Sequence, residues 1–213
     1  MEMQAFVRMS GVAALAGAAL CMGGRAGAGV IFGTGNIQYT NVNIAADANA
    51  MTIQGEVGST GVAVLFNGWS QGPSSPVMLH GQHGVAFVEA FDPADTLYRM
   101  TITAQTGYAF SAMDWKLDAA PPDDGLVTFR AFDAGGNMLP LDSGTDTFFF
   151  SHNGQNPYNA SVVVGSGANI SVLEIESTIP IMDLKQVSVE LVPGPASLGA
   201  LGLGTLLMGR RRR

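Results

Sequence analysis

The chain has 213 residues, of which 47% are hydrophobic, with a formal net charge of −7 and a single cysteine. One cysteine cannot form a disulfide framework within the chain, and the excess of acidic residues repels the phosphate backbone, so we expect no nucleic-acid partner. The length corresponds to one domain once the two ends of the chain are set aside.

Residues 1–28 have the organisation of a secretory signal peptide. Arg8 supplies a positive amino-terminal region, residues 12–22 form an apolar core, and Ala26-Gly27-Ala28 matches an A-x-A cleavage site. A buried amphipathic helix fits this stretch less well, because the run is apolar on all faces. We therefore expect an exported protein whose leader is removed after residue 28.

The stretch 29–191 is strongly acidic, with four cations, sixteen acidic residues and a net charge of −12. Anionic lipid is therefore as unfavourable a partner as nucleic acid. The stretch contains no cysteine, so its stability must come from a hydrophobic core. A domain of about 160 residues buries roughly 70% of the surface of its unfolded chain, which is sufficient without disulfides.

Polar and apolar residues alternate with a period of two along most of this stretch, which is typical of half-buried β-strands. The strands at 98–103 and 113–118 are expected to be neighbours joined by a turn at residues 105–107, and residues 134–137 are expected to close a hairpin. The full set of expected strands is 51–57, 62–66, 85–91, 98–103, 113–118, 126–132, 147–150, 161–164, 170–175 and 187–191.

About ten short strands separated by Gly, Asn, Asp and Pro turns predict an all-β fold. We expect an antiparallel β-sandwich or jelly roll that forms one domain over residues 29–191. This domain is flanked by the signal peptide and by a short apolar helix within residues 192–213. No amphipathic helical stretch of useful length lies between residues 29 and 191, which disfavours an α/β enzyme.

Two patterns in the sequence resemble a catalytic or a metal site. Gly68-Trp69-Ser70-Gln71-Gly72 matches the G-x-S-x-G motif of serine hydrolases, but that motif requires a helix directly after the serine, and Pro73 predicts a loop. His80-Gly81-Gln82-His83 offers two imidazoles, whereas zinc needs further ligands. The candidates for those ligands have no diagnostic spacing: Glu89, Asp92, Asp95 and His152. We therefore expect no catalytic residue, and a hydrolase ranks last among the functions considered.

Two acidic loops offer the oxygen ligands that Ca²⁺ prefers. Asp92 and Asp95 lie in one, and Asp142 and Asp146 in the other. Neither loop completes the EF-hand pattern, and aspartate in a turn commonly caps the backbone instead. These four residues are the candidates for a structural Ca²⁺, and no other cofactor is expected.

Aromatic residues suggest a second class of function. Trp69 and Tyr158 are predicted to lie in loops, where exposed rings could stack on sugars, by analogy with carbohydrate-binding modules on β-sandwiches. By alternation, Trp115 shares a face with Met113 and Leu117 and is predicted to lie in the core. The alternative function is therefore a secreted carbohydrate-binding module, which binds sugar either with or without calcium.

The last residues form a signal in three parts. The first part is Val192-Pro193-Gly194-Pro195. The second is an uncharged run from Ala196 and Ser197 to Met208, and the third is Arg210-Arg211-Arg212-Arg213. The run is short for a spanning helix, which needs about twenty apolar residues, and the arginines keep their end cytoplasmic. Such a segment serves either as a tail anchor or as a processing signal that is cut near the prolines.

This ordered set resembles the PEP-CTERM sorting domain of Gram-negative and related bacteria. The resemblance covers residues 192–213 only, and Gly194 stands where that family has Glu. It implies processing by exosortase, a membrane cysteine transpeptidase, and a link with exopolysaccharide. We therefore expect a non-enzymatic protein of the cell surface or extracellular matrix. It would be held first at the inner membrane and then delivered to the envelope or beyond.

Overall fold

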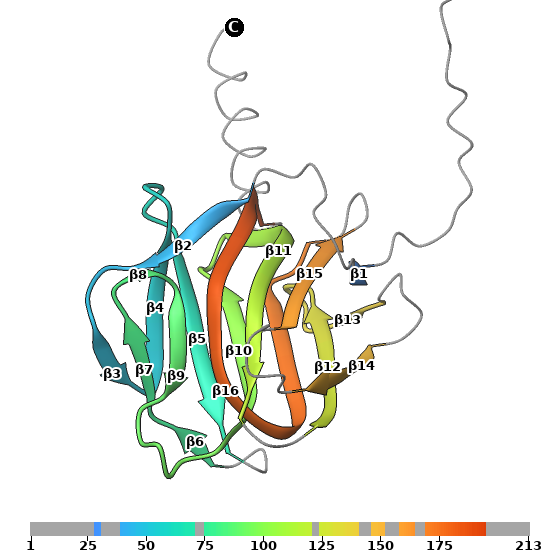
Figure 1. Ribbon diagram of the computed structural model, residues 1–213. Coiled ribbons are helices and arrows are strands. Elements are labelled where there is room, and N and C mark those ends of the chain that lie inside the picture. Colours follow the sequence, from blue (N-terminus) through green and yellow to red (C-terminus); the bar gives the residue numbers. More distant parts are fainter. Residues whose placement is uncertain are drawn as a thin grey trace, which may run out of the picture.

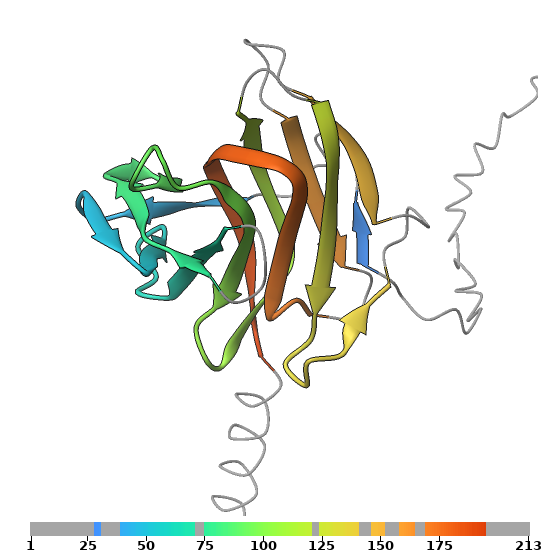
Figure 2. The same cartoon turned by 90° about the horizontal axis from the view of Figure 1, so that it is seen from below.

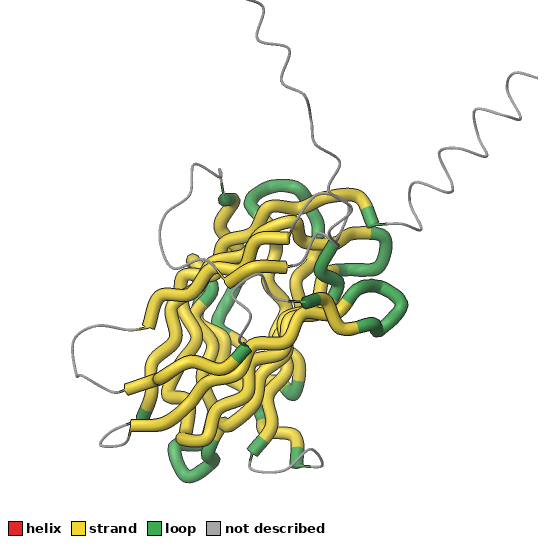
Figure 3. Tube along the Cα trace, turned by 90° about the vertical axis from the view of Figure 1, so that its right-hand side faces the viewer, coloured by secondary structure: helices red, strands yellow, loops and turns green. Residues whose placement is uncertain are grey.

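The computed structural model describes residues 28–30, 39–70, 75–120, 124–140, 146–151, 158–164 and 169–194. These residues form sixteen β-strands and no helix, which confirms the predicted all-β class (Figures 1 and 3). None of them belongs to a helix long and apolar enough to cross a membrane. The predicted signal peptide up to Gly27 and the tail from Pro195 onward lie outside the described residues.

Every pairing between the strands is antiparallel. In chain order the strands are β1 (Ala28–Val30), β2 (Thr40–Ile44), β3 (Ala48–Ala50), β4 (Thr52–Val57), β5 (Ala63–Trp69), β6 (Pro76–Val77), β7 (Leu79–Gln82), β8 (Gly84–Val85), β9 (Phe87–Ala90), β10 (Leu97–Ala104), β11 (Tyr108–Ala119), β12 (Asp124–Phe132), β13 (Met138–Leu139), β14 (Thr147–Ser151), β15 (Tyr158–Val164) and β16 (Val172–Pro193).

Strand β16 connects the two parts of the sheet. Its first residues, up to Ser177, lie between β10 and β12. From Asp183 onward, β16 lies between β11 on one side and β9 and β2 on the other. Pro180 falls between these parts, where the register with β10 and with β11 shifts. Because proline has no N–H, it is tolerated in a strand where the hydrogen-bond ladder is interrupted. The ribbon of β16 turns sharply there (Figure 2).

Two predictions about these strands are wrong. The turn at residues 105–107 joins β10 to β11 as expected, but the two strands are not neighbours, because β16 lies between them. The strands expected at residues 170–175 and 187–191 largely belong to one strand, β16. Alternation of polar and apolar residues identifies a strand. It does not identify the neighbouring strand, because strands pair through backbone hydrogen bonds that do not depend on side-chain identity.

The core lies where the inner faces of the two parts of the sheet meet. Trp115 of β11 is 2% exposed, and its ring packs edge-on against Phe129 of β12 with 5.3 Å between the ring centroids. These two strands share no backbone pairing among the described residues, so the contact joins two faces. Met113 and Leu117 are also fully buried. The predicted core position of Trp115 is therefore confirmed.

The hairpin predicted at residues 134–137 is confirmed, since β12 pairs with β13 across it. One carboxylate oxygen of Asp133 accepts the N–H groups of Gly135 and Asn137 at 2.8 and 2.9 Å. Gly136 has a φ of 77°, a left-handed conformation that glycine adopts without strain. Hydrogen bonds from the side chain and backbone of Asn137 hold the pKa of Asp133 below its ordinary value.

Candidate functional site

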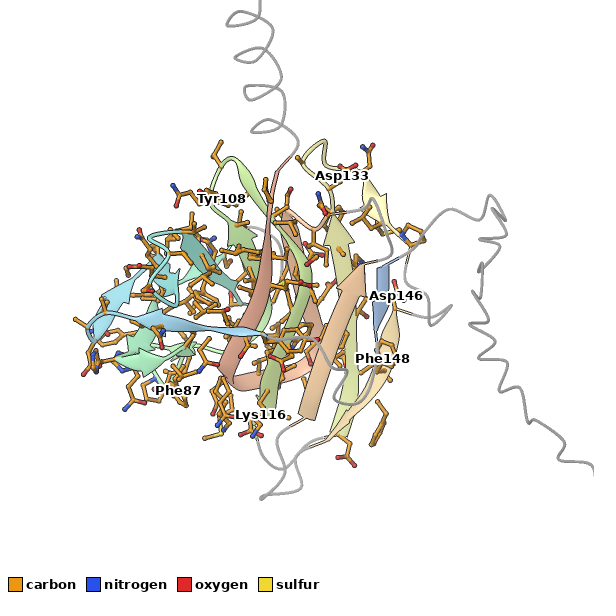
Figure 4. The ribbon with its side chains drawn as sticks, turned by 90° about the horizontal axis from the view of Figure 1, so that it is seen from above. Phe87, Tyr108, Lys116, Asp133, Asp146 and Phe148 are labelled. Carbon is orange, nitrogen blue, oxygen red and sulfur yellow. The ribbon has the colours of Figure 1, made fainter. Side chains whose placement is uncertain are left out.

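One group of charged side chains lies on the outer face of β9, β16 and β11, opposite the core. Cross-strand register places Glu89, Asp183 and Asp118 in one row. The ammonium group of Lys185 is 2.5 Å from a carboxylate oxygen of Asp118 and 3.2 Å from Oδ1 of Asp183. We call Glu89, Asp118, Asp183 and Lys185 the Lys185 cluster. Its two ladder neighbours, Phe87 on β9 and Lys116 on β11, are labelled in Figure 4.

Asp183 is the most deeply buried member of this cluster, with 3% of its surface exposed. Burial raises the pKa of Asp183, since a low-dielectric environment disfavours the charged carboxylate, while the hydrogen bond from Lys185 acts in the opposite direction. Its Oδ1 lies within ion-pair distance of Lys185 without accepting a well-aligned hydrogen bond. The Asp183 carboxylate is therefore attracted electrostatically to the Lys185 ammonium group, but its Oδ1 accepts no hydrogen bond.

Lys185 is held as a cation by its two carboxylate partners. Burial lowers the pKa of Lys185, but the hydrogen bonds from its ammonium group to Asp118 and Asp183 outweigh this effect and raise the pKa above its ordinary value. The ammonium group therefore neutralises charge between the two acids. No group of three metal-ligating side chains in the described part of the chain is placed to hold a metal ion.

A second charged group lies on the outer face of β10, β16 and β12. Glu174 bridges two guanidinium groups, those of Arg99 and Arg130, at 2.8 Å each. Arg130 also pairs with Glu176. The guanidinium carbon of Arg99 lies 4.9 Å from the ring centroid of Trp69, within the range of a cation–π interaction. This face therefore carries a chain of mutually paired charges that ends at a tryptophan.

The two aromatic residues predicted for sugar stacking are not in loops. Trp69 is the last residue of β5, and Tyr158 is the first residue of β15. Strands β11, β16 and β10 lie between β15 and β5 in the order of paired strands, so Trp69 and Tyr158 do not lie on neighbouring strands. Trp69 is half-buried, and the Arg99 guanidinium lies over its ring.

Two residues of the hydrolase and zinc alternatives, Ser70 and His80, have hydrogen-bond partners within the fold, and His152 lies outside the described residues. The Ser70 hydroxyl donates to the Ser75 carbonyl at 3.3 Å, and β6 begins directly afterwards at Pro76. His80 lies in β7 and hydrogen-bonds through Nδ1 to the side-chain oxygen of Asn49 at 2.7 Å. These contacts are those of turns and paired strands.

Backbone capping occurs in the first of the two predicted calcium loops. In the first loop, a carboxylate oxygen of Asp92 accepts the N–H of Ala94 at 2.8 Å, and the N–H of Asp95 donates to the Asp92 carbonyl at 2.9 Å. In the second, Asp146, labelled in Figure 4, accepts the hydroxyl of Thr147 at 2.9 Å. Asp142 lies outside the described residues. The contact of Asp92 with the Ala94 N–H is typical of aspartate in turns.

The structure describes the first three residues of the predicted sorting segment. Val192 and Pro193 end β16, where they pair with Ala109 and Tyr108 of β11. The N–H of Gly194 donates to the carbonyl of Gly107 at 2.8 Å. The remaining residues of that motif lie outside the described residues: Pro195, Ala196, Ser197, Arg210, Arg211, Arg212 and Arg213.

Sequence reasoning missed the Lys185 cluster and the Arg99–Glu174–Arg130 group. A signal was present, because the stretch 29–191 has only four cations and all four occupy outward positions of alternating strands. A cation that is retained in so acidic a domain is a candidate for ion pairing. Which acidic residues pair with each cation depends on which strands are neighbours, and the alternation of polar and apolar residues does not reveal that.

The chain was compared with protein-family models, with curated proteins and with solved structures. No match was found in any of the three comparisons. A function for this protein therefore has to be argued from its residues and their arrangement.

Proposed function

We propose that this protein is an exported, non-enzymatic component of the bacterial cell surface or extracellular matrix. Its carboxyl-terminal segment, residues 192–213, acts as a sorting signal of the PEP-CTERM type for an exosortase-type membrane transpeptidase, and its partner outside the cell is polysaccharide. The observation that carries this proposal is the ordered tail, in which Pro193 and Pro195 precede an uncharged run and four arginines. The signal-peptide pattern of residues 1–28 supports the same route.

The position of the tail on the domain supports this function. The sorting segment begins in the last two residues of β16, a strand that pairs with five other strands. A force or a membrane attachment applied at the tail would therefore act on the most extensively paired strand of the domain. This is a suitable connection for a domain that is held at a membrane before its release.

We further propose that the domain is a β-sandwich. Strands that pass from one sheet to the other through a bend or bulge are a known feature of such folds, and β16 bends near Pro180. The edge-on contact of Trp115 with Phe129 is the expected packing between two inner faces. A domain of this kind, with paired charges on its outer faces, suits a scaffold that has no disulfides.

The test is the intact mass and location of the protein in a bacterium that has the processing enzyme. We expect the exported wild-type protein to lack residues 1–28 and to end near Pro193 or Pro195. Replacing Arg210, Arg211, Arg212 and Arg213 with glutamine should leave an uncut tail, because the positive charge that orients the segment is lost. Replacing the same four residues with lysine keeps the charge and should preserve processing. Wild-type protein found in the cytosol with both ends intact would contradict the proposal.

A further inference from the structure

The end of β16 is packed against the turn that joins β10 to β11. Pro193 lies opposite Tyr108, labelled in Figure 4, and the next residue, Gly194, donates its N–H to the carbonyl of Gly107 at 2.8 Å. Gly107 has a φ of 90°, so the turn that presents this carbonyl requires glycine. The start of the tail is therefore part of the folded domain.

The residues at this junction fit their positions closely. The hydrogen bond from Gly194 to Gly107 makes Tyr108 and Pro193 a pair of the non-hydrogen-bonded kind, in which the missing N–H of proline leaves the ladder with β11 intact. Gly194 is buried. A Cβ atom at position 194 would lie 3.1 Å from the carbonyl carbon of Gly107 and 3.2 Å from its oxygen. A side chain at residue 194 would therefore require the backbone of Gly107 to shift by a few tenths of an ångström.

We infer that the domain protects the start of its own tail, because Pro193 and Gly194 are locked against the turn at Gly107. An enzyme needs an extended, accessible backbone at the bond it cuts. Access to the Pro193–Gly194 bond therefore requires the end of β16 to separate from β11 in a local opening of the structure. The idea that this protection regulates processing of the tail rests on the proposed function. The protection of the Pro193–Gly194 bond itself follows from the fold alone.

The protection can be measured on the purified full chain with a proline-specific endoprotease. The rate of cleavage after Pro193, followed by mass spectrometry, reports the population of the open junction when reclosing is fast. Gly107→Ala leaves the cleaved sequence unchanged but places a side chain at a φ of 90°. We expect this variant to be cut about tenfold faster, because alanine at positive φ destabilises the turn that holds Gly194.

A matched control separates local opening from global unfolding. Gly136→Ala puts a comparable strain, at a φ of 77°, into the hairpin between β12 and β13, which β16 separates from β10 in the sheet. We expect Gly136→Ala to leave cleavage after Pro193 near the wild-type rate under native conditions. Equal acceleration by both variants would overturn the inference, since cleavage would then proceed through unfolding of the whole domain.

Hydrogen exchange gives a readout that needs no variant. The amide of Gly194 should exchange more slowly in the wild-type chain than in an unstructured peptide of the same sequence, because it donates to the Gly107 carbonyl. Exchange at the unprotected rate would overturn the inference. Neither measurement involves the sorting enzyme, so failure here is distinct from failure of the proposed function, which depends on the mass of the exported protein.

Discussion

At the scale of single residues, the Asp183 carboxylate is buried beside the ammonium group of Lys185. A carboxylate that is 3% exposed loses most of its hydration, and the nearby ammonium group compensates for only part of that loss. The pKa of Asp183 is raised because the loss of hydration outweighs the attraction to Lys185. Burial of this acid therefore makes the stability of the domain depend on pH.

The sign of that dependence follows from proton binding. Between the ordinary pKa of an aspartate, about 3.9 in an unfolded chain, and the raised pKa of Asp183, the folded state binds more protons than the unfolded state. The free energy of unfolding must therefore fall as the pH rises through this window. We predict that Asp183→Asn removes this contribution, so that the wild type loses stability relative to the variant as the pH rises from the ordinary aspartate pKa, about 3.9, through the raised pKa of Asp183.

The measurement is urea unfolding of both proteins across that pH range. Asp95→Asn, in the loop before β10 where the side chain is exposed, is the matched control and should follow the wild-type curve. Parallel curves for the wild type and Asp183→Asn would show that burial of Asp183 does not contribute to the pH dependence.

At the scale of elements, β16 contains an irregularity beside β11. Lys185 pairs with Lys116 and Ser188 pairs with Asp114, so two residues of β16, Gln186 and Val187, face one residue of β11. This is a β-bulge. Gln186 has a φ of 54°, a conformation that is costly for a residue with a side chain. The bulge turns the strand after the Lys185 cluster and before the segment that leads to the tail.

We predict that Gln186→Gly stabilises the domain by about 0.5–1 kcal/mol, because glycine adopts positive φ without the strain that glutamine meets there. The hydrogen bond from the backbone N–H of Gln186 to the Ala86 carbonyl, at 2.9 Å, is retained by glycine. The readout is the midpoint of urea unfolding. As a control, Gln54→Gly, at an exposed position within β4, should destabilise the domain by a similar amount. A loss of stability in both variants would show that residue 186 is not strained.

At the scale of the whole molecule, the last described strand completes the fold. Ser188 of β16 hydrogen-bonds to Asn41 of β2 at 2.9 Å, across 147 positions of sequence. β16 also supplies partners to β9, β10, β11 and β12. Contacts between residues so distant in sequence form late and slow folding. The domain therefore cannot be completed until the carboxyl-terminal part of the chain is available.

We predict that a chain ending at Gly194 unfolds cooperatively, whereas a chain ending at Ser171, which lacks β16, does not. The reason is that removal of β16 leaves both parts of the sheet without their shared strand. Unfolding in urea, followed by tryptophan fluorescence and near-ultraviolet circular dichroism, distinguishes the two cases. A cooperative transition in the shorter chain would show that the domain folds without β16.

The sequence by itself determined the structural class and the inner face of several strands. A period of two placed Trp115, Met113 and Leu117 on the buried face, and the Gly-Gly-Asn turn predicted the hairpin after Asp133. These features are local: side-chain direction alternates along any strand, and tight turns require particular residues at particular φ values. The tail motif is also readable from the residues alone, and its role stays a prediction.

Only the tertiary structure decided which strands are neighbours and which charges meet. Lys185 binds Asp118, 67 residues away in the sequence, because β16 lies beside β11. Trp69 and Tyr158 lie on strands that are not neighbours. The same placement of β16 brings Gly194 against Gly107. The physical reason is that strands pair through backbone groups that every residue shares, so the order of strands in a sheet is set by the packing of the whole core.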